Sequence, residues 1–311
     1  MYMNKFDIMS AYRFMKRQGR LKLVVAAMLL AIVPASSNAQ IIEYFIPKYL
    51  TGELGGGLHS IQFTSQDGRH KCGAGFSFQT GCVFMIDDNW GVNSGLGLSS
   101  YRSRVIYNDV KEVSQAYDSI NDLPYEFHTY YTDFSERQNM LQLEIPITAY
   151  CQYPIINNSF ELVGKAGFRL GIPVNTTYKL LDGVYETRGY YPLTKVEYHD
   201  MPQHGFSAVE VNKEKGKCKL KPVNLSFLME CGMAYKINKA IRVYAGFYFS
   251  YCMSNIRKEN NSPVLSSDLK YNGTLNSNQT DKARLVSVGM HGGVIWDYRM
   301  KMSHRSGHKI H

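Results

Sequence analysis

Long apolar runs are nearly absent from this chain of 311 residues. The one clear run, Leu23–Val33, lies near the N-terminus and is too short to cross a membrane as a helix. No later run approaches that length, which excludes a protein that spans a membrane with helices.

Metal-binding motifs are also lacking. The six cysteines form no Cys-x-x-Cys pair, and the histidines form no close cluster before the C-terminal tail. His304, His308 and His311 in that tail are interpreted as an accident of composition. We therefore expect neither a metal nor a cofactor.

Residues 1–39 have the features of a secretory signal peptide. Basic side chains precede the apolar run, and the small residues Ser37-Asn38-Ala39 suit a cleavage site before Gln40. Because residue 40 is not cysteine, a lipid anchor at that position is not expected. We predict export, cleavage after Ala39, and a short periplasmic lead-in over residues 40–52.

The net positive charge is small once this segment is set aside. The chain has 35 Lys and Arg against 26 Asp and Glu, and the first 39 residues hold six of the bases and one of the acids. The remainder, 29 against 25, carries a net charge of +4. That balance does not favour nucleic acid as a partner.

A strict alternation marks the stretch Asn139–Tyr153. Every second side chain from Leu141 to Tyr153 is apolar or aromatic, whereas the intervening positions include Gln142, Glu144 and Gln152. A period of two indicates a β-strand. Its length and its charged polar face are typical of a barrel strand with an apolar outside and a wet inside.

The same alternation recurs and predicts eight strands. They are expected at Glu53–Phe63, Lys71–Met85, Trp90–Arg102, Asn139–Tyr153, Phe160–Ile172, Val223–Tyr235, Arg242–Met253 and Arg284–Trp296. The connections alternate between short turns, such as Ile86–Asn89, and long polar segments at about residues 103–138, 173–222 and 255–281. A transmembrane barrel produces this arrangement, with tight periplasmic turns and long extracellular loops. We predict an all-β, eight-stranded antiparallel up-and-down transmembrane barrel over residues 53–298, followed by a polar tail at 299–311.

The segment LQLEIPITAY at 141–150 carries a resemblance. It resembles the Leu-Glu-Ile-Pro-Leu signature of the PorT-like outer-membrane β-barrel family common in Bacteroidetes, with Ile147 in the fifth position. The resemblance implies a barrel in the outer membrane and suggests a component of a type IX protein export machine. The chain departs from the family after Tyr298, where a polar tail follows in place of a final aromatic strand end.

Charged side chains fall on the predicted inner face. They are Glu144, Glu161, Lys165, Arg169, Glu230 and Arg242. An eight-stranded lumen is filled by side chains, and isolated burial of an ion is costly, so these charges should pair. We interpret them as an ion-pair plug, and the alternative is a narrow polar pathway or gate.

The cysteines offer one candidate disulfide. Cys82, Cys151 and Cys231 fall on predicted outer faces, and Cys252 falls on an inner face. Cys72 lies at the outer end of the predicted strand Lys71–Met85 and Cys218 in the long segment 173–222, so they are the one plausible pair.

Tyrosine is concentrated in the two longest predicted loops. The residues expected to bind a partner are Tyr117, Tyr125, Tyr130, Tyr185, Tyr190 and Tyr191. Tyrosine offers a large contact area at low entropic cost, so these loops suit a protein or glycan. The alternative is an extended aromatic girdle with nearby lysines, Lys213 to Lys221, facing lipid head groups.

The predicted function is a structural or surface-binding role in the outer membrane, as a monomer in contact with lipid. One alternative is the export component suggested by the resemblance. Another is a lipid hydrolase or acyltransferase, which needs a serine beside a histidine such as His128 or His199.

Overall fold

The computed structural model describes residues 48–65, 67–156, 159–211 and 213–297. These residues belong to one compact unit that begins at Pro47. The predicted signal peptide and the polar tail from residue 299 lie outside the described residues. No helix in the described part of the chain is long and apolar enough to span a membrane.

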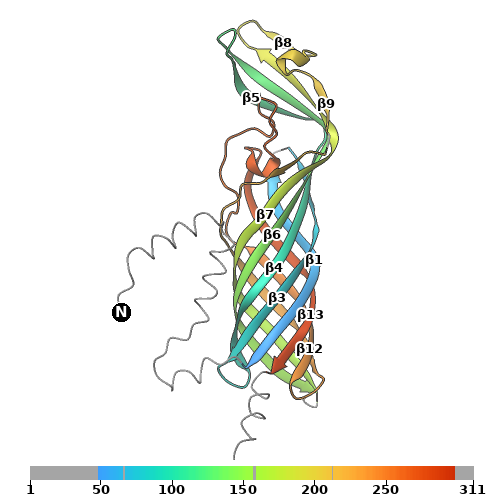
Figure 1. The fold of residues 1–311 in the computed structure, drawn as a ribbon, viewed down its shortest axis with the longest axis vertical. Coiled ribbons are helices and arrows are strands. Elements are labelled where there is room, and N and C mark those ends of the chain that lie inside the picture. The colour runs from blue at the N-terminus through green and yellow to red at the C-terminus, as the bar shows by residue number, and fades with distance from the viewer. Residues whose placement is uncertain (1–47, 66, 157–158, 212, 298–311) are drawn as a thin grey trace, which may run out of the picture. The chain divides into compact units, whose positions relative to one another are not determined.

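Eight of the described strands close into an antiparallel barrel (Figure 1). They are β1 (Tyr49–Ser65), β3 (Ala74–Met85), β4 (Trp90–Tyr107), β6 (Leu123–Ile156), β7 (Phe160–Tyr191), β11 (Asn224–Lys236), β12 (Ile241–Cys252) and β13 (Thr280–Asp297). Each pairs with the next in this order, and β13 pairs with β1. The predicted eight-stranded up-and-down topology is confirmed.

The strand faces follow the alternation in the sequence. In β6 the side chains of Gln142, Glu144 and Tyr150 are buried inside the barrel, whereas Ile147 is exposed outside. Several boundaries differ from the prediction: β4, for example, runs on to Tyr107 and β13 already starts at Thr280. β1 begins at Tyr49, inside the predicted lead-in, and the predicted strand 71–85 is divided into β2 (Arg69–Cys72) and β3.

Gly73 explains the division between β2 and β3. A Cβ atom built at Gly73 would lie 2.3 Å from the carbonyl oxygen of Arg102, so glycine permits a close approach to β4 there. β2 then pairs with the far part of β4, from Lys71 beside Arg104 to Arg69 beside Ile106.

Two of the predicted long loops are largely strands, which corrects the expectation of irregular loops at 103–138 and 173–222. β6 and β7 continue beyond the barrel as a paired ribbon, from Asn139 beside Thr177 to Glu126 beside Tyr190. β5 (Val110–Asp118) pairs with β6, and β8 (Val196–Tyr198), β9 (Ala208–Glu210) and β10 (Lys215–Lys217) pair with β7. Buried aromatic and β-branched residues every second position, Tyr125 to Tyr131, favour strand over loop. We call the part formed by β5, β8, β9 and the far ends of β6 and β7 the tip.

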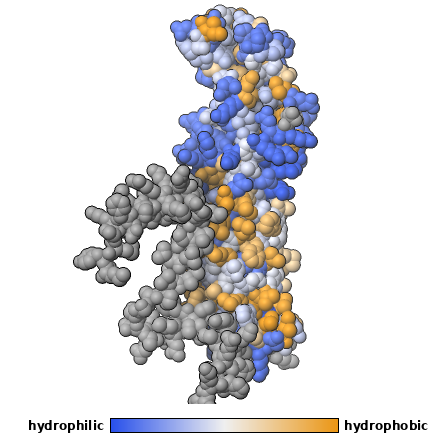
Figure 2. Space-filling model, in the orientation of Figure 1, coloured by the Kyte–Doolittle hydropathy of each residue, from blue (hydrophilic) through white to orange (hydrophobic). Residues whose placement is uncertain are grey.

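An apolar belt surrounds the barrel. Its exposed members include Leu54, Phe76, Ile147, Phe168, Phe247 and Met290, which come from six different strands. Figure 2 shows these apolar colours gathered over the barrel, with a hydrophilic zone between them and the tip. Trp90 and Tyr153 make an edge-to-face contact beside the short turns, which suits an aromatic girdle. The belt is the lipid-facing surface of a transmembrane barrel.

Apolar clusters lie on both sides of a polar layer inside the barrel. Tyr49, Val83 and Tyr150 belong to the cluster near the short turns. The larger cluster lies toward the tip and includes residues from the connection between β12 and β13, such as Val264 and Leu275. That connection contains a single 3-10 turn, η3 (Thr274–Asn276), and a second, η2 (Pro202–His204), lies in the tip. We call residues 255–279 the cap segment, because they pack against the larger cluster at this end of the lumen.

Candidate functional site

Buried charges form ion pairs between strands inside the lumen. All six predicted lumen residues, Glu144, Glu161, Lys165, Arg169, Glu230 and Arg242, are buried and point into the barrel. The structure brings them together as three pairs: Lys165 Nζ with Glu230 Oε2 at 3.0 Å, Arg169 Nη1 with Glu144 Oε2 at 2.9 Å, and Arg242 Nη1 with Glu161 Oε2 at 2.6 Å. Because the partners lie on different strands, each pair favours one strand register.

The lumen network contains groups that were not anticipated from the sequence. Glu53 of β1 pairs with Lys165, and Lys236 lies 2.8 Å from Glu161. His59 of β1, also not anticipated, hydrogen-bonds to Tyr248 of β12 at 2.5 Å, past the intervening strand β13. Glu53 was missed because the glycine-rich start of β1 gave no clear inner face.

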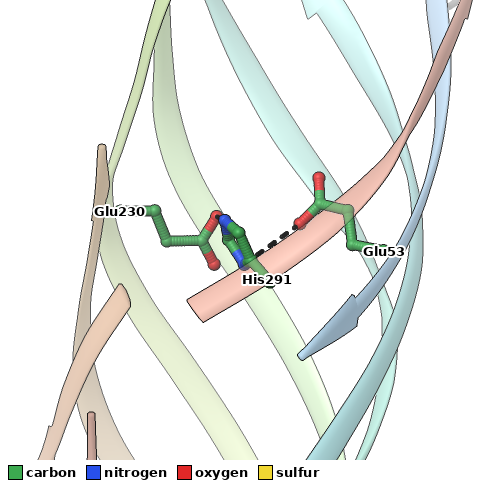
Figure 3. A group of neighbouring side chains, drawn as sticks. All are labelled: Glu53, Glu230 and His291. Carbon is green, nitrogen blue, oxygen red and sulfur yellow. Dashed lines mark ion pairs between the residues drawn. The ribbon is translucent and has the colours of Figure 1, made fainter. Parts of the chain in front are cut away.

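Glu53, Glu230 and His291 lie close together in the network (Figure 3). Their ligand atoms all lie within 4.8 Å of one another, a spacing that could hold a metal ion. His291 is 3.8 Å from each carboxylate. However, the Lys165 ammonium already contacts both carboxylates and supplies the positive charge that a metal would bring. We therefore assign no metal to this group.

Glu144 has the richest hydrogen bonding of the lumen acids. It accepts hydrogen bonds from Ser99 Oγ at 2.7 Å, from Tyr101 OH at 3.0 Å and from Gln142 Nε2 at 3.1 Å, in addition to its ion pair with Arg169. A buried carboxylate with this many donors is held in one position. The side chains fill the lumen, as the small strand number requires.

Two further carboxylates hold the cap segment in place. Glu136 accepts hydrogen bonds from the backbone N–H and the hydroxyl of Thr274, at 2.9 and 3.0 Å, and from Tyr271 OH. Glu112 accepts hydrogen bonds from Tyr131 OH at 2.8 Å and from the backbone N–H of Val264 at 3.0 Å. Burial raises the pKa of both carboxyls. The role of these acids was not visible in the sequence, where both fall in a predicted loop.

A pocket of about 780 Å³ opens in the tip. Three of the predicted binding residues, Tyr117, Tyr125 and Tyr191, line it, together with residues that were not predicted, among them Tyr198, Gln203, His204 and Phe206. Tyr125 and Tyr191 stack with ring centroids 5.2 Å apart, and Tyr191 OH donates a hydrogen bond to Asp118 at 3.0 Å. The Asn121 side chain and backbone N–H groups donate to Asp118, which lowers the pKa of that carboxyl to about 2.

The other three predicted tyrosines lie outside the pocket. Tyr130 lies under the Arg188 guanidinium, 4.5 Å from the ring centroid, and Tyr190 stacks on His128. Tyr185 is partly buried against the larger apolar cluster. These side chains hold the ribbon together, so the pocket draws on only half of the predicted set.

The predicted disulfide is wrong. Cys72 and Cys218 are both free. Cys72 is exposed on β2, where Gln62 Nε2 donates to its sulfur at 3.1 Å, whereas Cys218 is buried in the larger apolar cluster. One sulfur therefore faces solvent while the other faces the interior.

The histidines considered for lipid chemistry have acidic neighbours. His128 lies between Glu126 and Glu197, at 3.1 and 3.0 Å, and His199 contacts Asp200 on the surface. Neither arrangement supplies the serine nucleophile that such an enzyme needs.

No family model matches the chain, and no curated protein matches it. Solved structures with some similarity include Neisserial surface protein A (11% identity, covering 80% of this chain and 96% of that chain, TM-score 0.33). Others are Ail of Yersinia pestis in complex with the heparin analogue sucrose octasulfate (10%, 81% and 100%, TM-score 0.28) and the outer membrane protein OprG of Pseudomonas aeruginosa (11%, 80% and 95%, TM-score 0.31). Because these TM-scores are low, the barrel assignment rests on the chain's own strand pairing. The resemblance of residues 141–150 to the PorT-like family stays a prediction.

Proposed function

We propose that this protein is an outer-membrane surface-binding protein, exported through a cleaved signal peptide, and that it holds a neutral glycan in the pocket of the tip. The observation that carries this proposal is the aromatic pocket itself, placed at the end of the β6–β7 ribbon, far from the apolar belt. The short turns then face the periplasm and the tip faces outward.

The composition of the pocket favours a sugar chain over an anionic ligand. Tyr117 and Tyr198 expose ring surface on which the apolar face of a sugar can stack. Asn121 and Gln203 offer amide groups for hydroxyls, and Asp118 adds an acceptor that stays ionised at neutral pH. Neither lysine nor arginine is among the described lining residues, which disfavours a sulfated or phosphorylated chain.

The lumen supports binding over transport. Its charges are paired inside the barrel, and the cap segment packs against the larger apolar cluster toward the tip. A polar pathway would need mobile or unpaired groups along its length. We interpret the lumen network as a plug that specifies register.

A glycan array probed with the full chain in detergent micelles tests the proposal. We expect binding to neutral oligosaccharides that falls at least about tenfold in a Tyr117→Ala/Tyr198→Ala variant, because hot-spot aromatics carry most of the binding energy. Tyr153→Ala/Tyr235→Ala, at two exposed tyrosines of the barrel far from the pocket, serves as the matched control and should bind as the unmodified protein does. Equal binding by the pocket variant, or no binding to any neutral glycan, would overturn the proposal.

A further inference from the structure

Five basic residues occupy directly opposed positions on five neighbouring strands. The register pairs Lys71 of β2 with Arg104 of β4, Arg104 with Arg137 of β6, Arg137 with Lys179 of β7, and Lys179 with Lys215 of β10. We call this set the basic row. Paired residues of antiparallel strands project from the same face. The neighbours Ser103, Gln138 and Tyr178 are buried, so the basic row faces outward.

Such a row is costly unless an anion faces it. Neighbouring strands lie about 4.8 Å apart, and like charges in directly opposed positions destabilise a sheet. Among the residues that the structure describes, the ion pairs of the row are limited to Arg104 with Asp182, at 3.6 Å and with both side chains well exposed. The other four cations have no acidic partner in the described part, so the row as a whole keeps a strong positive charge.

The basic row lies just beyond the apolar belt. One outward position closer to the belt, Arg102, Asn139, Thr177 and Lys217 form a second register-matched set, which adds two more cations. The next outward residue of β6 is Leu141, where the apolar face begins. Arg137 to Leu141 spans about 13 Å along the strand, or about 10 Å above the belt at a usual barrel tilt. The head-group region is about 5–8 Å deep on each side of the hydrocarbon core. The second set, about 5 Å above the belt, therefore lies within that region, and the basic row lies just above it, within reach of its long side chains.

We infer that the basic row binds the phosphate groups of phosphorylated lipid head groups in the leaflet that borders it. Arginine can grip a phosphate with two parallel hydrogen bonds, and lysine adds point charge on each side. Because each of five neighbouring strands carries one of these cations, the basic row can bind several phosphates at once. The inference rests on the membrane-spanning barrel and is independent of any ligand in the tip.

Binding of two forms of one lipid to the full chain in neutral detergent micelles tests the inference. The probes are diphosphorylated lipid A and the same lipid without its phosphates. We expect the diphosphorylated form to bind at least about tenfold more tightly, with a preference that weakens as salt is added. Inorganic phosphate at the same concentration should not compete, because a single small anion cannot span the row.

Variants identify the residues involved. Arg137→Gln/Lys179→Gln should lose most of the preference for the phosphorylated lipid, whereas Lys195→Gln/Lys239→Gln, which removes the same charge from the tip and from a short turn, should keep it. Lys71→Gln/Lys215→Gln, at the exposed ends of the row, gives a second test should the central pair fail to fold. Equal binding of both lipid forms, full competition by phosphate, or unchanged binding by both row variants would overturn the inference. The pocket variant Tyr117→Ala/Tyr198→Ala should bind the lipid normally, which separates this result from the proposed glycan function.

Discussion

At the scale of single residues, Lys165 holds two buried carboxylates together. Its ammonium contacts both Glu53 and Glu230 in the lumen. We expect Lys165→Met to lower the free energy of unfolding by about 3–5 kcal/mol, because removing one partner leaves buried charge uncompensated. Urea unfolding in lipid vesicles measures this loss.

Lys236 provides the matched control for Lys165. It pairs with Glu161 at 2.8 Å, but 35% of its side chain is exposed. Lys236→Met should therefore cost about 1 kcal/mol or less. Similar losses in the two variants would contradict the view that Lys165 is the centre of the network.

The acids that hold the cap segment, Glu112 and Glu136, predict that the stability of this segment depends on pH. Burial raises the folded-state pKa of Glu112 and Glu136, so the folded state binds protons more tightly than the unfolded state. Their contribution to stability is complete below the ordinary carboxyl pKa and is lost as pH rises through the raised pKa. Hydrogen exchange of residues 262–276, corrected for intrinsic rates, should show stronger protection at pH 5 than at pH 8.

Glu136→Gln tests the cause of that pH dependence. The amide does not titrate, so the dependence of cap-segment protection on pH should become weaker in this variant. Glu210→Gln, at an exposed position of β9, is the control. Protection that rises with pH in the unmodified protein would contradict the assignment.

The inward direction of most lumen side chains could be predicted, but the partner of each could not. Period-two alternation places Glu144 and Glu230 inside, whatever the rest of the chain does. Which acid meets which base depends on the stagger with which the strands close, and one sequence does not record that stagger. Glu53 shows the limit, since Gly52 before it and the run Gly55–Gly57 after Leu54 leave little alternation to reveal its face.

At the scale of elements, a lipid-facing belt predicts that the stability cost of a charged substitution depends steeply on its depth in the bilayer. Phe247 is exposed near the middle of β12, beside Met290 of β13. Phe247→Arg should cost about 2–4 kcal/mol, because a charge at the bilayer midplane is poorly solvated. Val223→Arg, next to the end of β11 that faces the tip, should cost about 1 kcal/mol or less. Urea titration in vesicles compares the two variants, and equal costs would argue against a lipid-facing belt.

The alternation in the sequence predicted that these strands exist, but it did not predict how long they are. The acids and turn-forming residues between Tyr107 and Phe134 favour a loop when read alone. In the structure, pairing with β5 on one side and β7 on the other supplies the backbone hydrogen bonds that keep β6 extended over 34 residues. Such tertiary pairing overrides local preference.

At the scale of the whole molecule, a closed lumen predicts an absence of conduction. The paired charges fill the polar layer, and apolar clusters lie on both sides of it. Purified protein in a planar bilayer should show no stable single-channel steps. Glu144→Ala/Arg169→Ala removes a complete ion pair and is the variant most suited to open a path. If the unmodified protein showed conductance steps as large as those of this variant, the interpretation of the lumen network as a plug would be wrong.

Heat-modifiability tests the barrel itself. A closed barrel keeps its backbone hydrogen bonds in detergent, so the unboiled protein should migrate differently from the boiled protein on a denaturing gel. Replacement of residues 114–127 and 188–206 by short turns should leave this shift intact, because Val113 lies opposite His128 and Thr187 hydrogen-bonds to Ser207. Loss of the shift on removing the tip would mean that the barrel does not fold without it.

Closure of the barrel could be predicted from the sequence, but the pocket could not. An even number of strands joined by alternating short and long connections leaves few arrangements other than a closed meander. The pocket instead combines residues 117–125 with residues 191–206, whose proximity depends on how the tip strands pair. The tyrosine content of the sequence indicated the two long segments that form the tip, but it did not indicate which of their residues line the pocket.

The unbroken course of β6 and β7 carries the tip far beyond the apolar belt. From Leu141 at the belt to Leu123 at the tip, β6 covers about 60 Å along its own path, at about 3.3 Å per residue. A ligand held there would lie well beyond the apolar belt. Because the same two strands also form part of the barrel wall, a pull on the tip passes directly into the hydrogen-bonded wall, with no hinge of loose chain between them.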